Sequence, residues 1–244
     1  MIPDTELIVV GDIHGDYDSL TKILEKSDFE NSNRIIVFLG DYADRGANGL
    51  EVYNKILSLK KRHPKRVVML KGNHESYTKY NGEITPLFAP CTFVNELMSK
   101  VDNWREKLEE FFDLWKSLPI AAIVEGKYLF VHGGISSKIK SLEDLKNPTL
   151  AVEEDVLWSD PYEEKGECPN PRGAGILFGP DVSKKVCEKL GIKKIIRSHQ
   201  PHIALSGCRE HHDGRIITIS STTVYGGTPA FLKIKNNKIT VDVV

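Results

Sequence analysis

Three short apolar runs near the start of the chain limit the possible folds more than any other feature. They cover residues 7–10, 35–39 and 67–70, and a glycine follows each run within two residues. Runs of four or five aliphatic residues bounded by glycine are typical of buried strands. Residues 17–29 and 50–64, which separate the runs, have the i, i+3, i+4 apolar spacing of amphipathic helices. This pattern predicts βαβ units of about thirty residues, and therefore a parallel sheet.

The rest of the chain changes character several times. We expect helices between residues 76 and 118, and a β-hairpin formed by residues 120–124 and 128–131. Residues 136–181 contain five prolines and are expected to be mainly loop. A short helix over 182–190, a strand over 194–197 and short antiparallel strands from 203 onwards complete the pattern. The sequence therefore predicts a single α/β domain over residues 1–244, with a mixed sheet or two packed sheets.

Composition excludes several classes of protein. The chain has 33 Lys and Arg against 34 Asp and Glu, and this balance argues against a broad nucleic-acid or membrane surface. Four cysteines with no CxxC spacing disfavour a zinc ribbon and a disulfide scaffold. The start of the chain has neither a basic segment nor an apolar run longer than four residues, so we expect no signal peptide or membrane span. These features predict a cytoplasmic protein.

The residues that follow the first three runs carry metal-binding chemistry. Asp12 and His14 follow the first run, Asp41 the second and Asn73 the third. Ligands bind beyond the carboxyl ends of parallel strands, so these side chains should meet at one edge of the sheet. Any one of these motifs, considered alone, could be an ordinary turn rather than part of a metal site. Three consecutive strand ends with Asp or Asn after glycine favour a site, because a protein core needs none of them.

Two histidines, His132 and His199, follow later apolar runs in the same way. A single histidine after a strand is more often a capping or core residue than a ligand. Together with the first three strand ends, however, they complete a set of nitrogen and oxygen ligands that could hold two divalent ions, with Asp41 or a hydroxide between them. Imidazole and carboxylate ligands suit manganese, iron, zinc or nickel better than they suit magnesium.

Other polar residues next to these motifs suit phosphate chemistry. Arg45 offers a planar fork for phosphate, although it could instead form a loop salt bridge with Asp44. His74 is an acid–base group beside Asn73. Arg172 and Tyr225 both lie in glycine-containing loops, and Arg172 alone could be a solvated surface residue.

These motifs resemble those of a known family. GDIHG at 11–15, GDYADRG at 40–46 and GNHE at 72–75 look like the three hallmark blocks of calcineurin-like metallophosphoesterases. Later blocks resemble the serine/threonine phosphoprotein phosphatase (PPP) family in the same order: LPIAAIV at 118–124, HGG at 132–134, LWSDP at 157–161, PRGAGILFG at 171–179, IIRSHQP at 195–201 and TISSTTVYGG at 218–227. The resemblance implies a two-sheet β-sandwich flanked by helices, with a dinuclear metal site.

The resemblance also implies a role for each matching residue. Asp12 and His14 would bind one metal, Asp41 would bridge both, and three residues would bind the second: Asn73, His132 and His199. Arg45 and Arg172 would hold the phosphate, and Tyr225 would line the pocket. His74, oriented by Asp44, would be the general acid, and a hydroxide bridging the metals would attack phosphorus. We expect two divalent ions, manganese first, with iron, zinc or nickel as alternatives.

The sequence departs from the family pattern at three places. Lys71 stands where the family usually has arginine before GNHE; it keeps the charge of a substrate-binding residue but loses the bidentate fork. Thr222, Thr223 and Val224 replace alanine, proline and asparagine in the tyrosine loop. Residues 76–92 match the family poorly and border the site, so they are candidates for a substrate-selecting loop.

The leading hypothesis is metal-dependent hydrolysis of phosphomonoesters, with phosphoserine and phosphothreonine in proteins as substrates. A dinucleoside tetraphosphate hydrolase, or another small-molecule phosphoesterase, uses the same three N-terminal blocks and is the alternative enzyme. A metal-binding scaffold without turnover is the alternative from another class. The expected partner is a phosphoprotein or phosphopeptide, and the sequence does not identify a regulatory subunit.

Overall fold

Two five-stranded sheets face each other across one apolar layer. The structure is a computed structural model that describes residues 5–244. In the first sheet the strand order is β15-β14-β1-β2-β3, and in the second it is β12-β13-β11-β7-β6. Side chains from both sheets, among them Val9, Phe130 and Ile217, fill the layer between them. The expected β-sandwich is therefore confirmed.

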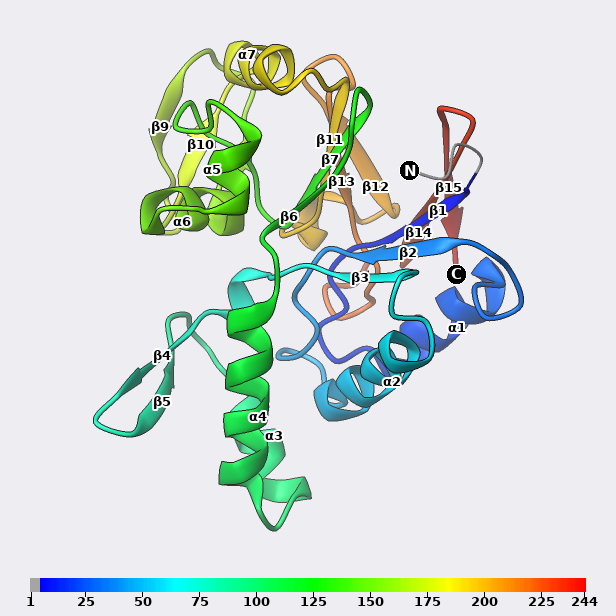
Figure 1. Cartoon of the computed structure of the whole chain (residues 1–244), viewed down its shortest axis with the longest axis vertical. Coiled ribbons are helices and arrows are strands. Elements are labelled where there is room, and N and C mark those ends of the chain that lie inside the picture. Colours follow the sequence, from blue (N-terminus) through cyan, green and yellow to red (C-terminus); the bar gives the residue numbers. More distant parts are fainter. Residues whose placement is uncertain (1–4) are drawn as a thin grey trace.

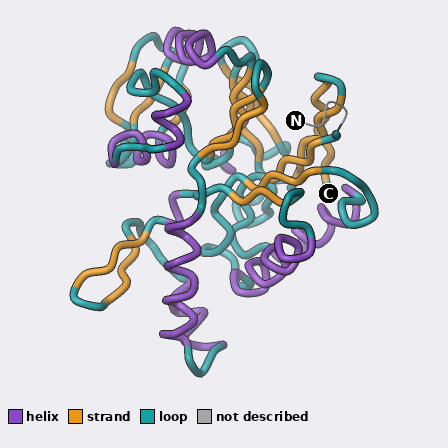
Figure 2. The backbone as a smooth tube through the Cα atoms, in the orientation of Figure 1, coloured by secondary structure: helices purple, strands orange, loops and turns teal. Residues whose placement is uncertain are grey.

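Each sheet contains three adjacent parallel strands, which lie at one side of the first sheet and at the centre of the second. In the first sheet these are β1 (Leu7–Val10), β2 (Ile35–Phe38) and β3 (Val67–Met69), joined by α1 (Tyr17–Ser27) and α2 (Gly49–Arg62). In the second they are β7 (Tyr128–Val131), β11 (Lys194–Arg197) and β13 (Ile216–Ile219). The βαβ pattern predicted from the first three apolar runs is thus confirmed. The loops after these strands gather beneath the sheets, in the centre of the view (Figure 2).

Antiparallel strands complete both sheets. In the first, β14 (Ala230–Lys235) pairs with β1 and with β15 (Lys238–Val243). In the second, β6 (Ala121–Val124) pairs with β7, and β12 (Cys208–His211) pairs with β13. The predicted hairpin at 120–131, the strand at 194–197 and the late antiparallel strands are confirmed.

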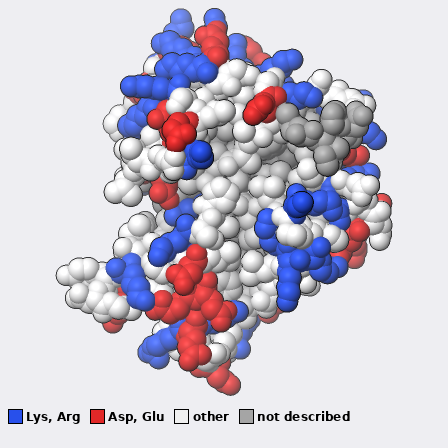
Figure 3. Space-filling model, in the orientation of Figure 1, with Lys and Arg blue, Asp and Glu red and all other residues white. Residues whose placement is uncertain are grey.

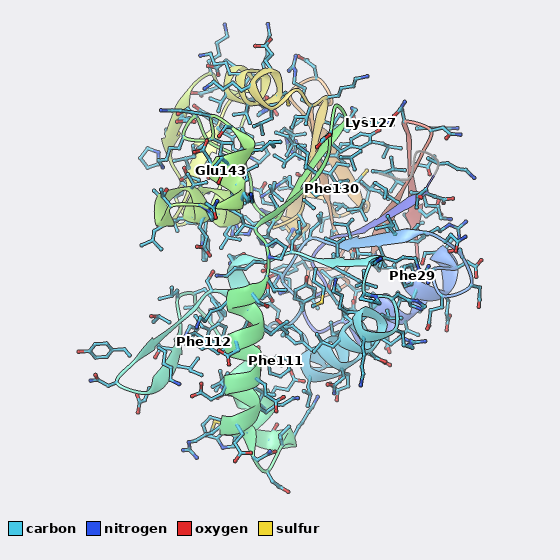
Figure 4. All side chains as sticks on the ribbon, viewed as in Figure 1. Phe29, Phe111, Phe112, Lys127, Phe130 and Glu143 are labelled. Atoms are coloured by element: carbon cyan, nitrogen blue, oxygen red, sulfur yellow. The ribbon has the colours of Figure 1, made fainter. Side chains whose placement is uncertain are left out.

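Helices cover the outer face of each sheet (Figure 1). The four helices α1, α2, α3 (Phe93–Lys100) and α4 (Trp104–Ser117) share one core with the first sheet, which includes Phe29, Phe111 and Phe112 (Figure 4). Helices α5 (Leu142–Lys146), α6 (Leu150–Trp158) and α7 (Pro180–Leu190) pack on the second sheet. The fold is therefore a four-layer αββα arrangement. Within residues 5–244 no helix combines the length and apolarity needed to cross a bilayer.

The prediction of helices throughout 76–118 is wrong at its start. Residues Tyr77–Tyr80 (β4) and Glu83–Pro86 (β5) form a two-stranded hairpin that extends away from the body of the molecule (Figure 1). Its turn is Asn81-Gly82, and both residues have positive φ angles. Asn-Gly favours this tight turn because both residues adopt positive φ at little cost. The signal was present in the sequence, and the apolar periodicity further along obscured it.

The prediction that 136–181 is mainly loop is also incomplete. Helices α5 and α6 lie there, followed by a small sheet of β8 (Asp160–Pro161), β10 (Ile176–Phe178) and β9 (Glu167–Pro169). Ser141 and Thr149 occupy the N-cap positions of the two helices. Pro148 precedes the second cap and so removes no helical hydrogen bond. Proline content alone was therefore a poor guide to this segment. The short turns Asn73–Glu75 (η1) and Pro201–Ile203 (η2) are the remaining elements.

Candidate metal centre

Six predicted ligands meet where the parallel strands of the two sheets end. Asp12, Asp41 and Asn73 follow β1, β2 and β3, whereas His132 and His199 follow β7 and β11. A β-bridge between Asp12 and Ser220 joins the two sets of strand ends. All six ligands are buried, with at most 6% of each residue exposed: Asp12, His14, Asp41, Asn73, His132 and His199. The sequence prediction that these residues form one cluster is consistent with this geometry.

In one half of the cluster, three potential ligand atoms lie close to one another. Asn73 Oδ1 lies 2.8 Å from His132 Nε2 and 2.9 Å from His199 Nδ1, and the two histidine nitrogens are 3.1 Å apart. Asp41 Oδ2 is 3.4 Å from His132 Nε2. Ligands that share an ion at about 2.1 Å lie roughly 3 Å from one another. These donors therefore fit a divalent cation.

The other half uses the loop after β1. His14 Nε2 lies 3.4 Å from Asp41 Oδ2, while its Nδ1 donates to the carbonyl oxygen of Ala43 at 3.0 Å. That bond leaves Nε2 as the ligand atom. Asp12 Oδ1 accepts the His199 N–H at 3.0 Å, and its buried Oδ2 has no hydrogen-bond partner among the described residues. An orphaned buried carboxylate oxygen is costly unless a cation faces it.

Burial shifts the pKa values of these groups in directions that suit a cation among them. Burial raises the pKa of Asp12 to about 6, and burial together with the neighbouring Asp12 carboxylate raises the pKa of Asp41 well above its ordinary value. Burial, with the nearby His74, lowers the pKa of His14 to about 3, and burial also lowers the pKa of His132 and of His199. These histidines are neutral near pH 7, which is the form that binds metals.

The backbone of the site is held in an uncommon conformation. Positive φ angles occur at His14 (49°), Asp41 (55°), Asp44 (66°), Arg45 (70°) and His199 (66°). Non-glycine residues adopt this region at a cost of order 1 kcal/mol or more and usually do so where the surrounding structure enforces it. Gly72 of the GNHE motif is equally constrained, since a Cβ there would collide with the Asp41 carboxylate.

His74 and Asp44 form a buried pair at the edge of the cluster. His74 Nδ1 donates to Asp44 Oδ2 at 2.9 Å, so Nε2 is the ring nitrogen left for another partner. Burial opposes ionisation of Asp44, but hydrogen bonds from His74 and from the N–H groups of Phe93 and Thr92 lower its pKa overall. Asp44 therefore pairs with His74, and among the described residues it forms no ion pair with Arg45. The Phe88 ring packs 4.4 Å from the His74 ring.

Glu75 supports the site in a way that sequence reasoning missed. Its carboxylate accepts the N–H groups of Asp41 and Gly72, both at 2.8 Å, and the hydroxyl of Tyr53 at 2.8 Å. Tyr53 in turn accepts the indole N–H of Trp115 at 2.8 Å. The last residue of GNHE therefore ties the loop after β2 to the loop after β3 and to α4. No periodicity in the sequence links these residues, because the contacts are long-range.

The predicted phosphate-binding residues lie on loops around the cluster. Tyr225 places its ring 5.6 Å from the His14 ring. Burial raises the pKa of Tyr225, and the charge of neighbouring Arg45 partly offsets the rise. Arg45 Nε is itself buried without a hydrogen-bond partner among the described residues. Arg45 and Tyr225 therefore lie on the His14 side of the cluster.

Arg172 lies on the loop between β9 and β10 and is held there by a buried carboxylate. Its Nε donates to Asp160 Oδ2 at 3.0 Å, and Asp160 Oδ1 accepts from the fully buried Arg197 at 2.8 Å. Asp160 Oδ1 also lies 4.0 Å from His199 Nε2. The pairing uses Nε of Arg172 and leaves the two terminal nitrogens of its guanidinium for a ligand. The sequence alone assigned no role to Asp160 or Arg197, although Asp160 lies in the LWSDP block and Arg197 in the IIRSHQP block.

Lys71 is the one predicted substrate residue that the structure does not bring to the cluster. Its amine pairs with Glu153 of α6 at 2.7 Å. Both residues line a cavity of about 630 Å³ between the start of β6 and helices α5 and α6. The backbone of Lys71 is nevertheless close to the site, because Gly72 and Asn73 follow it directly in the chain.

Comparison with known proteins relates this geometry to one group of enzymes. Residues 5–202 match the family model described as calcineurin-like phosphoesterase. The serine/threonine-protein phosphatase 4 catalytic subunit of Eremothecium gossypii is 34% identical, over 96% of this chain and 75% of that protein. A serine/threonine-protein phosphatase of Caenorhabditis elegans is 33% identical over 91% of this chain, which spans only 48% of that longer relative.

A solved structure agrees with these sequence relatives. A serine/threonine phosphatase from Saccharomyces cerevisiae superposes with a TM-score of 0.82 at 25% identity, covering 99% of this chain and 80% of that one. The likeness extends over both sheets and therefore includes the strands from which the clustered residues project.

Proposed function

This chain belongs to the calcineurin-like phosphoesterase family, and within it to the serine/threonine protein phosphatases; on that premise we propose that it hydrolyses phosphoserine and phosphothreonine in proteins. The observation that carries the proposal is the convergence of six buried residues, Asp41 and five others, from loops at strand ends of both sheets. We propose that residues 1–244 act as one catalytic domain, because the site needs both sheets.

The ligand set supports two divalent ions. Asn73, His132 and His199 would hold one ion and Asp12 and His14 the other, with Asp41 next to both groups. When bound, such ions lower the pKa of water and neutralise charge on phosphoryl oxygens. Three histidines with carboxylates and an amide favour manganese, with iron, zinc or nickel as alternatives.

The chain's own residues would bind and orient the phosphate. Arg45 and the free terminal nitrogens of Arg172 would contact phosphoryl oxygens from two sides. Tyr225 would line the same pocket beside Arg45. Asp160 would keep Arg172 aimed at the site, since it anchors that guanidinium to the buried Arg197.

His74 would supply the proton that the leaving oxygen needs. An alkoxide of serine or threonine leaves poorly at neutral pH, so protonation as the P–O bond breaks lowers the barrier. His74 Nε2 would donate that proton, because Nδ1 is engaged with Asp44. Solvent would then return a proton to the ring.

The direct test is a substrate panel with the metal-reconstituted chain. Phosphoserine, phosphothreonine and phosphotyrosine peptides are compared with diadenosine tetraphosphate at equal manganese. We expect the highest kcat/KM on phosphoserine or phosphothreonine peptides. Faster hydrolysis of diadenosine tetraphosphate would contradict the proposal in favour of a dinucleoside tetraphosphate hydrolase. No turnover on any phosphoester would favour a scaffold that binds metal without catalysis.

We also propose a cytoplasmic location and a phosphoprotein partner. All four cysteines are free thiols in the structure, which suits a reducing compartment. On the face shown in Figure 3, basic and acidic side chains are interspersed, and acidic ones gather over α4. We propose that the positive charge that attracts phosphate comes from Arg45, Arg172 and the bound ions of the site itself.

A further inference from the structure

The loop that carries Tyr225 runs alongside the metal-binding loop after β1. The Gly11 N–H donates to Ser221 Oγ at 2.8 Å, and the Ser221 N–H donates to the Asp12 carbonyl at 3.3 Å. These contacts join segments more than two hundred residues apart in the sequence. The position of the tyrosine loop therefore depends on the loop that supplies Asp12 and His14.

Asp16, at the end of the metal-binding loop, makes the strongest of these connections. Its Oδ2 accepts both the N–H and the Oγ–H of Thr223, each at 2.7 Å. The same carboxylate caps helix α1, because it accepts the Ser19 N–H at 3.0 Å and the Ser19 Oγ–H at 2.7 Å. Hydrogen bonds to an ionised carboxylate are about twice as strong as neutral ones. Asp16 therefore bonds both to the start of α1 and to the loop that carries Tyr225.

The contact with Asp16 depends on which amino acid stands at position 223. Thr223 stands where the resembled family loop has proline, and proline could donate neither a backbone N–H nor a hydroxyl. Proline stiffens a loop through its fixed φ, and threonine does not. Two hydrogen bonds to Asp16 restrain Thr223 in place of the ring.

Tyr225 lies only two residues beyond this contact. Its ring is 5.6 Å from the His14 ring, and it is 38% exposed, so its own packing holds it only in part. We propose that Asp16 and Thr223 are positioning residues that hold Tyr225 beside Arg45, where it shapes the pocket for the substrate phosphate. This inference rests on the proposed phosphatase function and adds residues to its substrate side.

Two substitutions weaken the contact to different extents, and both keep the Ser19 N–H bond that caps α1. In Asp16→Asn, an amide oxygen at the Oδ1 position still accepts the Ser19 N–H, because Asn and Asp are equally good N-caps. An amide nitrogen at the Oδ2 position can accept neither from Thr223 nor from the Ser19 hydroxyl. Thr223→Val removes only the hydroxyl. We expect kcat/KM on a phosphoserine peptide to fall about tenfold in Asp16→Asn and about threefold in Thr223→Val, chiefly through a higher KM. Ser19→Ala is the matched control, because it removes the Ser19 Oγ–H bond to Asp16 and leaves both Thr223 bonds in place, and its kcat/KM should stay within about twofold of wild type.

A second background and a second readout separate positioning from a general structural effect. In the Tyr225→Ala background, Asp16→Asn should lower kcat/KM by less than about twofold, because the tyrosine that Asp16 positions is already absent. Amide hydrogen exchange over residues 221–227 should be faster in Asp16→Asn than in wild type and unchanged in Ser19→Ala. Exchange can be measured on metal-free protein, so it does not depend on activity.

The results that would overturn the inference are distinct from those that would overturn the proposed function. Three results would each overturn the positioning role. The first is an equal loss of kcat/KM in Ser19→Ala and Asp16→Asn, and the second is a loss in the Tyr225→Ala background as large as in wild type. The third is amide exchange over residues 221–227 that Asp16→Asn leaves unchanged. A wild-type chain inactive on every phosphoester would instead overturn the phosphatase proposal and, with it, the substrate part of this inference.

Discussion

The metal-ligand side and the phosphate side of the site are held by different parts of the fold. Five of the six ligands project from the ends of parallel strands, and all six are buried. The phosphate-side residues Arg45, Arg172 and Tyr225 lie on loops, and Tyr225 is 38% exposed. The comparison teaches that strand ends fix the positions of the proposed ion ligands, whereas local loop contacts fix the residues proposed to receive substrate.

This difference predicts unequal tolerance to change. A strand-end ligand is constrained by two sheets and by a core shared between them, so its loss cannot be compensated locally. A loop residue is held by a few hydrogen bonds, such as the one from Arg172 to Asp160.

The largest effect is expected at Asp41, the side chain next to both ligand groups. Asp41 Oδ2 lies 3.4 Å from both His14 Nε2 and His132 Nε2. Asp41→Asn should lower kcat/KM on every phosphoester by about a thousandfold or more, because both ions lose a shared anionic ligand. Steady-state assays with added manganese measure this, and the exposed Asp113→Asn on α4 is the control. A loss smaller than tenfold would show that Asp41 is not shared by two ions.

The second-largest loss of activity is expected for His74→Asn, and its size should depend on the leaving group of the substrate. We expect a loss of about a hundred- to ten-thousand-fold on a phosphoserine peptide, because the alkoxide then leaves without a proton. Para-nitrophenyl phosphate has a better leaving group and should lose much less, with metal content unchanged. Equal losses on both substrates would rule out the general-acid role of His74.

The third prediction concerns stability without metal. The folded pKa of Asp12 is about 6, above its ordinary value of 3.8, so the buried carboxylate destabilises the metal-free fold once it ionises. That penalty is absent below pH 3.8 and complete above pH 6. Asp12→Asn should therefore stabilise the metal-free protein by about 2–3 kcal/mol at pH 7, and the gain should shrink as pH falls through this window.

Thermal or urea unfolding in the presence of a chelator measures this difference. With manganese bound, the same substitution should destabilise the protein instead, since the ion loses a ligand. A gain that does not vary between pH 4 and 7 would show that the Asp12 carboxylate is not the cause.

The smallest effect is expected at Lys71. Because its amine pairs with Glu153 and faces another cavity, Lys71→Ala should leave kcat/KM within about twofold and cost about 0.5–1 kcal/mol of stability. Glu153→Ala should cost a similar amount if the pair is all that is lost. A tenfold loss of kcat/KM confined to Lys71→Ala would support the expectation from sequence that Lys71 contacts substrate.

Sequence alone predicted the metal side better than the phosphate side, and the reason is physical. Strand ends recur after apolar runs, so Asp12, Asp41 and Asn73 could be located from periodicity and glycine. The Glu75–Tyr53–Trp115 hydrogen bonds and the Asp160 link between Arg172 and Arg197 join residues far apart in the sequence. Such contacts follow from tertiary packing and leave no local pattern.

The same reasoning explains the errors in the fold. The hairpin of β4 and β5 depends on the Asn81-Gly82 turn, a two-residue signal beside a long helical pattern. The Asp16–Thr223 contact was equally hidden, because each residue alone is an ordinary cap or loop residue. Family resemblance identified Thr223 as a departure, and only the structure shows its partner.

We propose that the six clustered residues hold two ions, one on either side of Asp41. Anomalous diffraction from crystals of the manganese-loaded chain tests it directly. We predict two anomalous peaks, one against Asn73, His132 and His199 and one against Asp12 and His14, with the Asp41 carboxylate between them. A single peak, or a second peak away from Asp12 and His14, would contradict the claim.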